Sequence, residues 1–133
     1  MTPPSWAPTT DQVAALLRAR TRGPGSRDAA TAAEQGRFTD ATRPTDDQVA
    51  ELIELACNEL LAALRGHTLC TTNLELAATT AAAYRAAMLV EISYHPEATN
   101  GDRTAFSALS ELWSDARDAL AETSGALCPL ESV

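Results

Sequence analysis

The sequence has no lysine, and all ten of its basic residues are arginine. We interpret this bias, which accompanies a high alanine content, as the mark of a GC-rich coding sequence rather than as a functional signal. Eighteen acidic residues bring the formal net charge to −8 at pH 7. Gripping a phosphate backbone requires clustered lysine or arginine, so this charge balance argues against a nucleic-acid-binding protein.

Large apolar side chains are also scarce. Aromatic residues make up 5% of the 133 residues, and much of the 45% hydrophobic fraction is alanine. Alanine is the best helix former but buries little area. A chain of this length forms one domain with its own core, and neighbouring subunits could complete the burial. The most apolar stretch, residues 81–90, is short and contains Arg85, so we expect no membrane span.

The chain has three cysteines, Cys57, Cys70 and Cys128. This odd number does not give an even disulfide framework. The N-terminus has neither a basic start nor an apolar run, so it does not resemble a signal peptide. We therefore expect a reducing compartment, in which disulfides are rare.

Two near-identical segments predict helix starts. Residues 8–16 and 44–52 share the order Pro-Thr-x-Asp-Gln-Val-Ala-x-Leu. Each contains Thr-x-x-Gln, a capping box in which the threonine oxygen accepts from an early helix N–H and the glutamine reaches back. Repetition of this signal favours a helical layout for the whole chain.

Apolar spacing and stop signals predict four helices, over residues 10–21, 46–65, 73–94 and 100–124. Asn73 can cap the third helix, and Gly66 and Gly125 end the second and fourth. We predict an all-α fold, a small four-helix bundle with extended N- and C-terminal arms. The helical domain spans residues 1–125, and an extended docking tail spans residues 126–133.

The first two predicted helices are joined by a long loop, residues 22–43, whose far end Phe38 is expected to anchor. The predicted core takes its large side chains from the three later helices: Leu52, Ile53, Leu60, Tyr84, Met88, Leu109 and Trp113.

Catalytic chemistry is not visible in the sequence. The histidines are His67 and His95, and a Cys70–His67 dyad in a polar loop would lack an oxyanion site. His67-x-x-Cys70 could be half of a zinc site, but Cys57, Cys128 and His95 lack paired spacing. We predict no enzyme activity, no cofactor and no metal.

The C-terminal segment is unusually apolar for a tail. Leu127, Pro129, Leu130 and Val133 are candidates for docking onto a partner, since Pro129 keeps the chain extended. The alternative is a strap that covers the chain's own bundle. Both interpretations stay open at this point.

The order of the motifs resembles the head-to-tail adaptor, or connector, proteins of tailed phages, especially those of actinobacteria. The resemblance covers most of the chain and is structural rather than catalytic. It is carried by residues 6–9, 11–21, 38–45 with Gln48 and Val49, 81–84, 88–97 and 109–113.

Several expectations follow from the resemblance. It implies an α-helical subunit of a homo-oligomeric ring, a dodecamer, docked below the portal protein at the head–tail junction of a virion assembled in the host cytoplasm. DNA would pass through the lumen without specific binding, and a stopper or tail-terminator protein would bind below. The terminal segment would reach the portal or an adjacent adaptor.

The acidic residues Asp47, Glu51 and Glu54 share a polar face of the second predicted helix. In a ring they are candidates for a lumen-facing surface that repels DNA, because like charge lets a phosphate backbone slide. Outside a ring they would simply be solvated. The competing interpretation of the chain is a free acidic helical module that binds or regulates another protein, and the third is a small enzyme.

Overall fold

The computed structural model describes residues 3–17, 38, 44–94 and 103–128. In chain order, these residues form α1 (Thr10–Leu16), α2 (Asp46–Ala63), α3 (Thr72–Tyr94) and α5 (Arg103–Leu127). The described part of the chain contains no strand, and the all-α four-helix bundle predicted from the sequence is confirmed.

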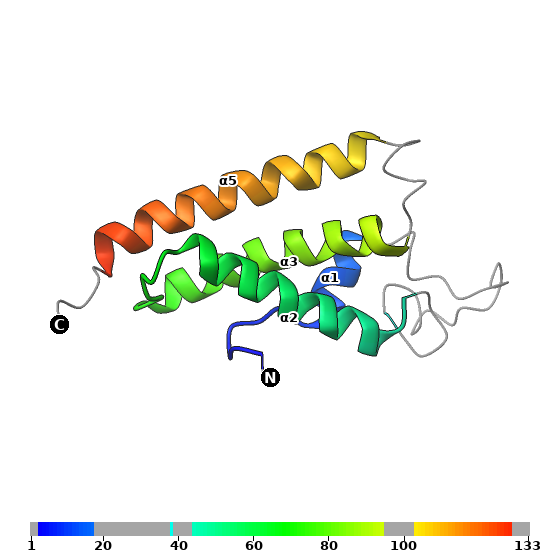
Figure 1. Ribbon diagram of the computed structural model, residues 1–133, viewed down its shortest axis with the longest axis horizontal. Coiled ribbons are helices and arrows are strands. Elements are labelled where there is room, and N and C mark those ends of the chain that lie inside the picture. Colours follow the sequence, from blue (N-terminus) through cyan, green and yellow to red (C-terminus); the bar gives the residue numbers. More distant parts are fainter. Residues whose placement is uncertain (1–2, 18–37, 39–43, 95–102, 129–133) are drawn as a thin grey trace, which may run out of the picture.

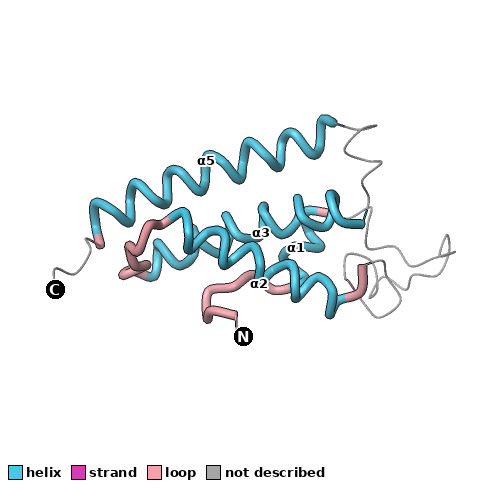
Figure 2. The backbone as a smooth tube through the Cα atoms, in the orientation of Figure 1, coloured by secondary structure: helices cyan, strands magenta, loops and turns pink. Residues whose placement is uncertain are grey.

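Helix α3 lies at the centre of the bundle (Figure 1). It packs against each of the other three helices, most extensively against α5 and α2, whereas α2 and α5 have few contacts with each other. The three long helices run alternately up and down, so the ends of α2 and α5 lie at the same end of the bundle as the start of α3 (Figure 2). Segments far apart in the sequence therefore meet at this end.

Both predicted capping boxes are present. Thr9 Oγ1 accepts from Gln12 N at 3.1 Å, and the Thr9 N–H donates to Gln12 Oε1 at 2.7 Å. The same reciprocal pair joins Thr45 and Gln48, at 3.3 and 3.0 Å. Each box satisfies N–H groups that a helix start would otherwise leave unpaired, which fixes where α1 and α2 begin.

Two helix boundaries correct the sequence prediction. Helix α1 ends at Leu16 instead of near residue 21, because Leu17 has φ −131° and ψ 49° and leaves the helical region. Helix α3 is capped by Thr71, whose Oγ1 accepts from Leu74 N at 3.1 Å, and Asn73 lies inside the helix. Thr71 offers the same type of side-chain acceptor two residues earlier.

Helix α2 stops close to the predicted place. It ends at Ala63, and the chain then turns through Arg65 at φ 54° and Gly66 at φ 86°. Positive φ is natural for glycine but strained for arginine, so Gly66 is the residue that permits this turn.

Helix α5 does not stop at Gly125, as the sequence predicted, but continues to Leu127. The Cys128 N–H donates to Ser124 O at 2.7 Å and prolongs the helical hydrogen bonding past the glycine. Glycine favours a helix end without requiring one, and a Cβ at position 125 would make an ordinary contact with the His67 ring, 3.5 Å from Nε2. The boundary expected between residues 125 and 126 therefore falls within a continuous helix.

A disulfide joins Cys70, in the α2–α3 loop, to Cys128, just after α5. The expectation that the cysteines form no disulfide framework is therefore wrong for two of the three. The antiparallel arrangement of α3 and α5 brings the start of one beside the end of the other, and the two Cα atoms lie 5.9 Å apart.

Most of the predicted core is buried. Five of its seven side chains have at most 8% of their surface exposed, namely Ile53, Leu60, Met88, Leu109 and Trp113. Leu52 and Tyr84 are only partly buried and pack against the edge of the core. Phe38 is buried as predicted, while the other residues of the predicted loop, 22–37 and 39–43, lie outside the described residues.

The N-terminal arm is less extended than predicted. The Ala7 N–H donates to Pro4 O at 3.0 Å and closes a turn. Thr79 on α3 donates its hydroxyl to Trp6 O, and Trp6 packs against the core. The arm therefore belongs to the bundle.

The first testable prediction concerns the core contribution of α2. Leu60 has no exposed surface, so Leu60→Ala should lower the free energy of unfolding by about 2–5 kcal/mol through the cavity it leaves. Its neighbour Leu61 is 43% exposed, and Leu61→Ala is the matched control with a small expected effect. Denaturant unfolding measures both, and equal losses would show that α2 is packed in another rotation.

The second prediction concerns the disulfide, which links residues 58 apart in the sequence. Chain-entropy arguments put the stabilisation from a loop of this size at about 4 kcal/mol. Dithiothreitol should therefore lower the free energy of unfolding of the wild type by about that amount. A Cys70→Ser/Cys128→Ser variant should be insensitive to the reductant, and a Cys57→Ala variant should respond as the wild type does.

Candidate docking surface

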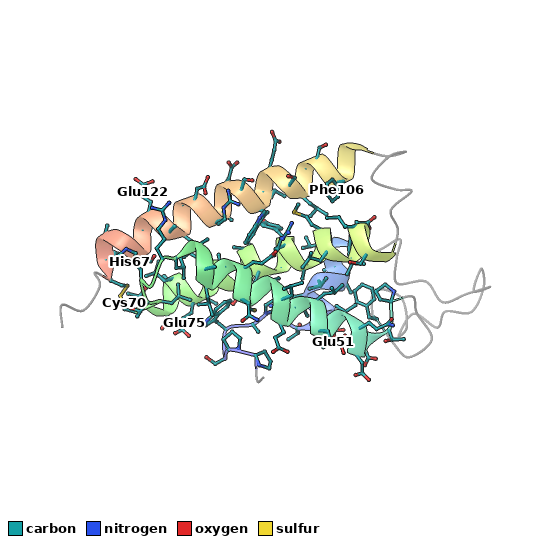
Figure 3. All side chains as sticks on the ribbon, viewed as in Figure 1. Glu51, His67, Cys70, Glu75, Phe106 and Glu122 are labelled. Carbon is teal, nitrogen blue, oxygen red and sulfur yellow. A yellow bond between two sulfur atoms is a disulfide. The ribbon has the colours of Figure 1, made fainter. Side chains whose placement is uncertain are left out.

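The chain leaves α5 at a point held by several contacts. Cys128 is bonded to Cys70, and its carbonyl oxygen lies 3.2 Å from Nδ1 of His67, which donates when that nitrogen carries the proton. The Cys70 N–H lies 3.2 Å from the Cys128 sulfur. Figure 3 shows His67 and Cys70 together at this end of the molecule. The exit of the C-terminal segment is therefore fixed in space.

A groove with charged walls lies between α2 and α5. This α2–α5 groove has a volume of about 570 Å³, and its charged or titratable lining residues are Arg65, His67, Arg117, Asp118 and Glu122. Cationic and anionic groups are mixed along it, so it does not present a field of one sign. Figure 3 labels Glu122 on α5 and His67 below it, at the two walls of this groove.

A polar cluster continues from that groove and ties three helices together. Arg85 on α3 forms a two-pronged ion pair with Glu59 on α2, at 2.6 and 3.2 Å. The guanidinium carbon of Arg85 lies 6.0 Å from the ring centre of Trp113 on α5, and that of Arg117 lies 5.6 Å from it. Two-pronged pairs and cation–π contacts favour a defined geometry, so this cluster positions α5 relative to α2.

The opposite side of α5 carries a groove of a different kind. This α3–α5 groove has a volume of about 560 Å³, and none of its lining residues is charged. Small side chains form its walls, with Ala77 and Thr80 on α3 and Ala119 on α5. Leu127 lines the end where the chain leaves α5. An uncharged, mostly apolar groove suits an apolar peptide segment.

Every helix also exposes large apolar side chains. Within the described residues these are Leu16 on α1, Leu55 and Leu61 on α2, Leu76 and Ile92 on α3, and Leu112 and Leu127 on α5. Single exposed leucines are common on protein surfaces. Here they occur on all four helices.

The three predicted lumen residues share one helix but differ in exposure. Asp47 and Glu51 are exposed, and Glu54 is partly buried. Figure 3 places Glu51 on the α2 side of the bundle, well away from His67 and Cys70. An acidic surface is thus present on α2, and whether it faces a lumen stays a prediction.

The four predicted docking residues fall into two groups. Leu127 is the last residue of α5 and is 59% exposed, so the expectation of an extended chain there is wrong. Pro129, Leu130 and Val133 lie outside the described residues. Their role in docking stays a prediction.

Nucleophilic chemistry through the cysteines has no support at the described positions. Cys70 is in the disulfide and cannot act as a thiolate with His67. Burial raises the pKa of the Cys57 thiol to about 11, and the nearby Glu54 carboxylate adds to the rise. The thiol of Cys57 therefore stays protonated near neutral pH and behaves as a small apolar side chain. Among the described residues, no group of histidine, cysteine and acidic side chains has the geometry to hold a metal.

Sequence reasoning missed the disulfide and the Trp113 cluster, although a signal for the first was present. Cys70 precedes one predicted helix and Cys128 follows the next, and in antiparallel neighbours those two positions come together. The Trp113 cluster had no comparable signal, since Glu59, Arg85 and Arg117 look like ordinary surface charges in sequence.

Comparison of the chain with protein-family models, curated proteins and solved structures found no match. Within the described residues, no helix has the length and apolar character needed to cross a membrane. Conclusions about function therefore depend on the residues and geometry of this chain.

Proposed function

We propose that this chain is the subunit of a homo-oligomeric ring, a dodecamer, between the portal and the tail of a tailed-phage virion. The observation that carries the proposal is the presence of large exposed apolar side chains on all four helices around a bundle that already has its own core. A ring subunit is contacted by neighbours on two sides and by partners above and below. Apolar contacts in several directions fit that position.

The order of motifs resembling head-to-tail adaptors supports the same proposal. The residues that carry the resemblance include the capping boxes of α1 and α2, the alanine-rich α3 and Trp113 on α5. The family implies a portal above the ring and a stopper or tail-terminator protein below it. In this arrangement the virion is the site of action, and the ring performs no catalysis.

The charge of the chain fits a ring through which DNA passes. With a net charge of −8, a lumen lined by Asp47 and Glu51 would repel phosphate and let the duplex slide. Glu54 contributes less to such a surface because it is partly buried.

The C-terminal segment is the proposed contact with the portal or an adjacent adaptor. It follows Leu127, the last residue of α5, whose exposed side chain lies beside the fixed exit at Cys128. Apolar side chains at positions 130 and 133 could each add roughly 1.5–3 kcal/mol if fully buried on a partner. Repetition around a ring would strengthen such a contact through avidity.

A second candidate function is a free acidic helical module that binds or regulates one protein partner. The observation that favours it is the uncharged α3–α5 groove, which could take a single apolar segment. Such a module would need one docking surface and no symmetric neighbours. Its mass in solution would not rise to that of a ring in the presence of a portal.

The third prediction tests the ring. Mixed with the portal of its own phage, the full-length chain should form a complex whose native mass shows about twelve copies per portal. The test variant is a truncation after Cys128, which removes residues 129–133 but keeps the buried Cys128 and the disulfide. It should fold normally yet fail to join the portal, while Ser132→Ala, a change within the same segment, should join. A full-length chain that stays monomeric beside the portal contradicts the ring, and a truncated chain that joins contradicts the role of the tail.

The fourth prediction tests the acidic surface of α2. The assembled wild-type ring should not bind duplex DNA, whereas an Asp47→Arg/Glu51→Arg variant should bind it in a salt-sensitive manner, as measured by fluorescence anisotropy. Glu111→Arg/Glu122→Arg is the control with an equal charge change at exposed positions of α5. Equal DNA binding by both variants would show that these α2 residues do not face the lumen, and tight binding by the wild type would contradict a repelling lumen.

A further inference from the structure

We propose that in the free chain the α3–α5 groove is the docking site of the chain's own C-terminal segment, residues 129–133. This inference concerns the isolated protein and does not depend on the proposed role in a virion. Docking there would cover the apolar side chains of residues 129–133 until a partner binds them.

The first support is the place where the segment begins. Leu127 lines the groove, and the next residue, Cys128, is fixed by its bond to Cys70 and by the contact of its carbonyl oxygen with His67. Thr71, which follows Cys70, lines the same end of the groove. The segment therefore starts at the mouth of the groove rather than at a distance from it.

The second support is length. The groove follows α5 from Ala116 to Leu127, which at the helical rise of 1.5 Å per residue is about 16 Å. Five residues in a polyproline II conformation, at 3.1 Å each, also span about 16 Å. A segment that turns back at residue 129 can thus reach the other end of the groove, running antiparallel to α5.

The third support is the side-chain pattern. Pro129 favours polyproline II, which has three residues per turn, so Leu130 and Val133 would fall on one face. That face can meet the apolar side chains of the groove, while Glu131 and Ser132 point to solvent. A leucine and a valine at positions i and i+3 can both contact such a groove from one face of the segment.

The fourth support is charge. The segment carries the acidic residue Glu131, and no acidic side chain lines the α3–α5 groove. The α2–α5 groove, which is the other space beside the exit, contains Asp118 and Glu122 along with its cationic residues. The uncharged α3–α5 groove does not repel Glu131, and its apolar lining matches Leu130 and Val133.

Because the segment is tethered beside the groove, the chain's own segment binds there in preference to that of a second copy. A short flexible connection gives an effective concentration in the millimolar range, far above the micromolar concentration of other copies. The free energy gained by burying the apolar side chains is similar in size to the entropy cost of ordering five residues, so docking is reversible. A partner can therefore capture the segment without unfolding the bundle.

The test is nuclear magnetic resonance on the full-length chain. Methyl groups of Leu130 or Val133 should show Overhauser contacts with those of Ala77 or Ala119. Amide exchange at residues 130–133 should be about threefold or more slower than in the free peptide Cys-Pro-Leu-Glu-Ser-Val. A mixture of isotope-labelled and unlabelled chains separates contacts within one chain from contacts between chains.

Matched variants place the contacts in one groove. Ala119→Trp fills the α3–α5 groove from an exposed position and should return tail exchange to the peptide rate. Ala63→Trp, in the α2–α5 groove, should leave tail exchange unchanged. Circular dichroism checks that each variant is folded, and the wild-type contacts need no variant at all.

Three results would overturn the inference. Exchange at the peptide rate in the wild type would show an undocked tail. Contacts seen only between labelled and unlabelled chains would assign the groove to a second copy. Contacts with His67 or Arg117, or loss of protection in Ala63→Trp alone, would move the tail to the other groove.

Discussion

The bundle depends on the close approach that alanine permits along α3. This helix contacts all three others, and its central alanines have no exposed surface: Ala78, Ala81, Ala82, Ala86 and Ala87. Small side chains allow neighbouring backbones to come close on several sides at once, and a larger residue at these positions would displace a neighbour. Each alanine buries little apolar area, so α3 organises the fold without supplying large anchors of its own.

That constraint explains why other links gather on α5. This helix packs on α3 but has few contacts with α2, and a groove lies on each side of it. The Trp113 cluster joins its middle to α2 and α3, and the disulfide at Cys128 joins its end to the α2–α3 loop. The disulfide and the cation–π contact of Arg85 with Trp113 therefore add to the packing of α5 on α3.

The sequence predicted the number and type of helices because capping and periodicity are local signals. The boxes at Thr9 and Thr45 occur as expected, and Phe38 and Trp113 are buried. The misplaced boundaries at Leu17 and Gly125 reflect tertiary contacts, since a local signal does not reveal what packs on it. The grooves beside α5 were not predictable either. The α2–α5 groove depends on how few contacts those two helices make, and the α3–α5 groove on which small side chains meet, and both are decided by packing around α3.

A tail that begins at a rigid exit can serve two sites in succession. Apolar side chains at the end of a free chain promote non-specific association, and occupying a groove of the same molecule lowers their exposure. The same occupancy reduces the apparent affinity for any partner in proportion to the fraction of tails that are docked. A groove of small, uncharged side chains keeps that fraction moderate, because it offers modest burial and no ion pairs. A weak internal site and a repeated external site are therefore compatible. In the single chain, a small preference for the docked tail over the free tail is enough to cover its apolar side chains. Avidity around a ring can shift the same equilibrium towards tails bound to the partner.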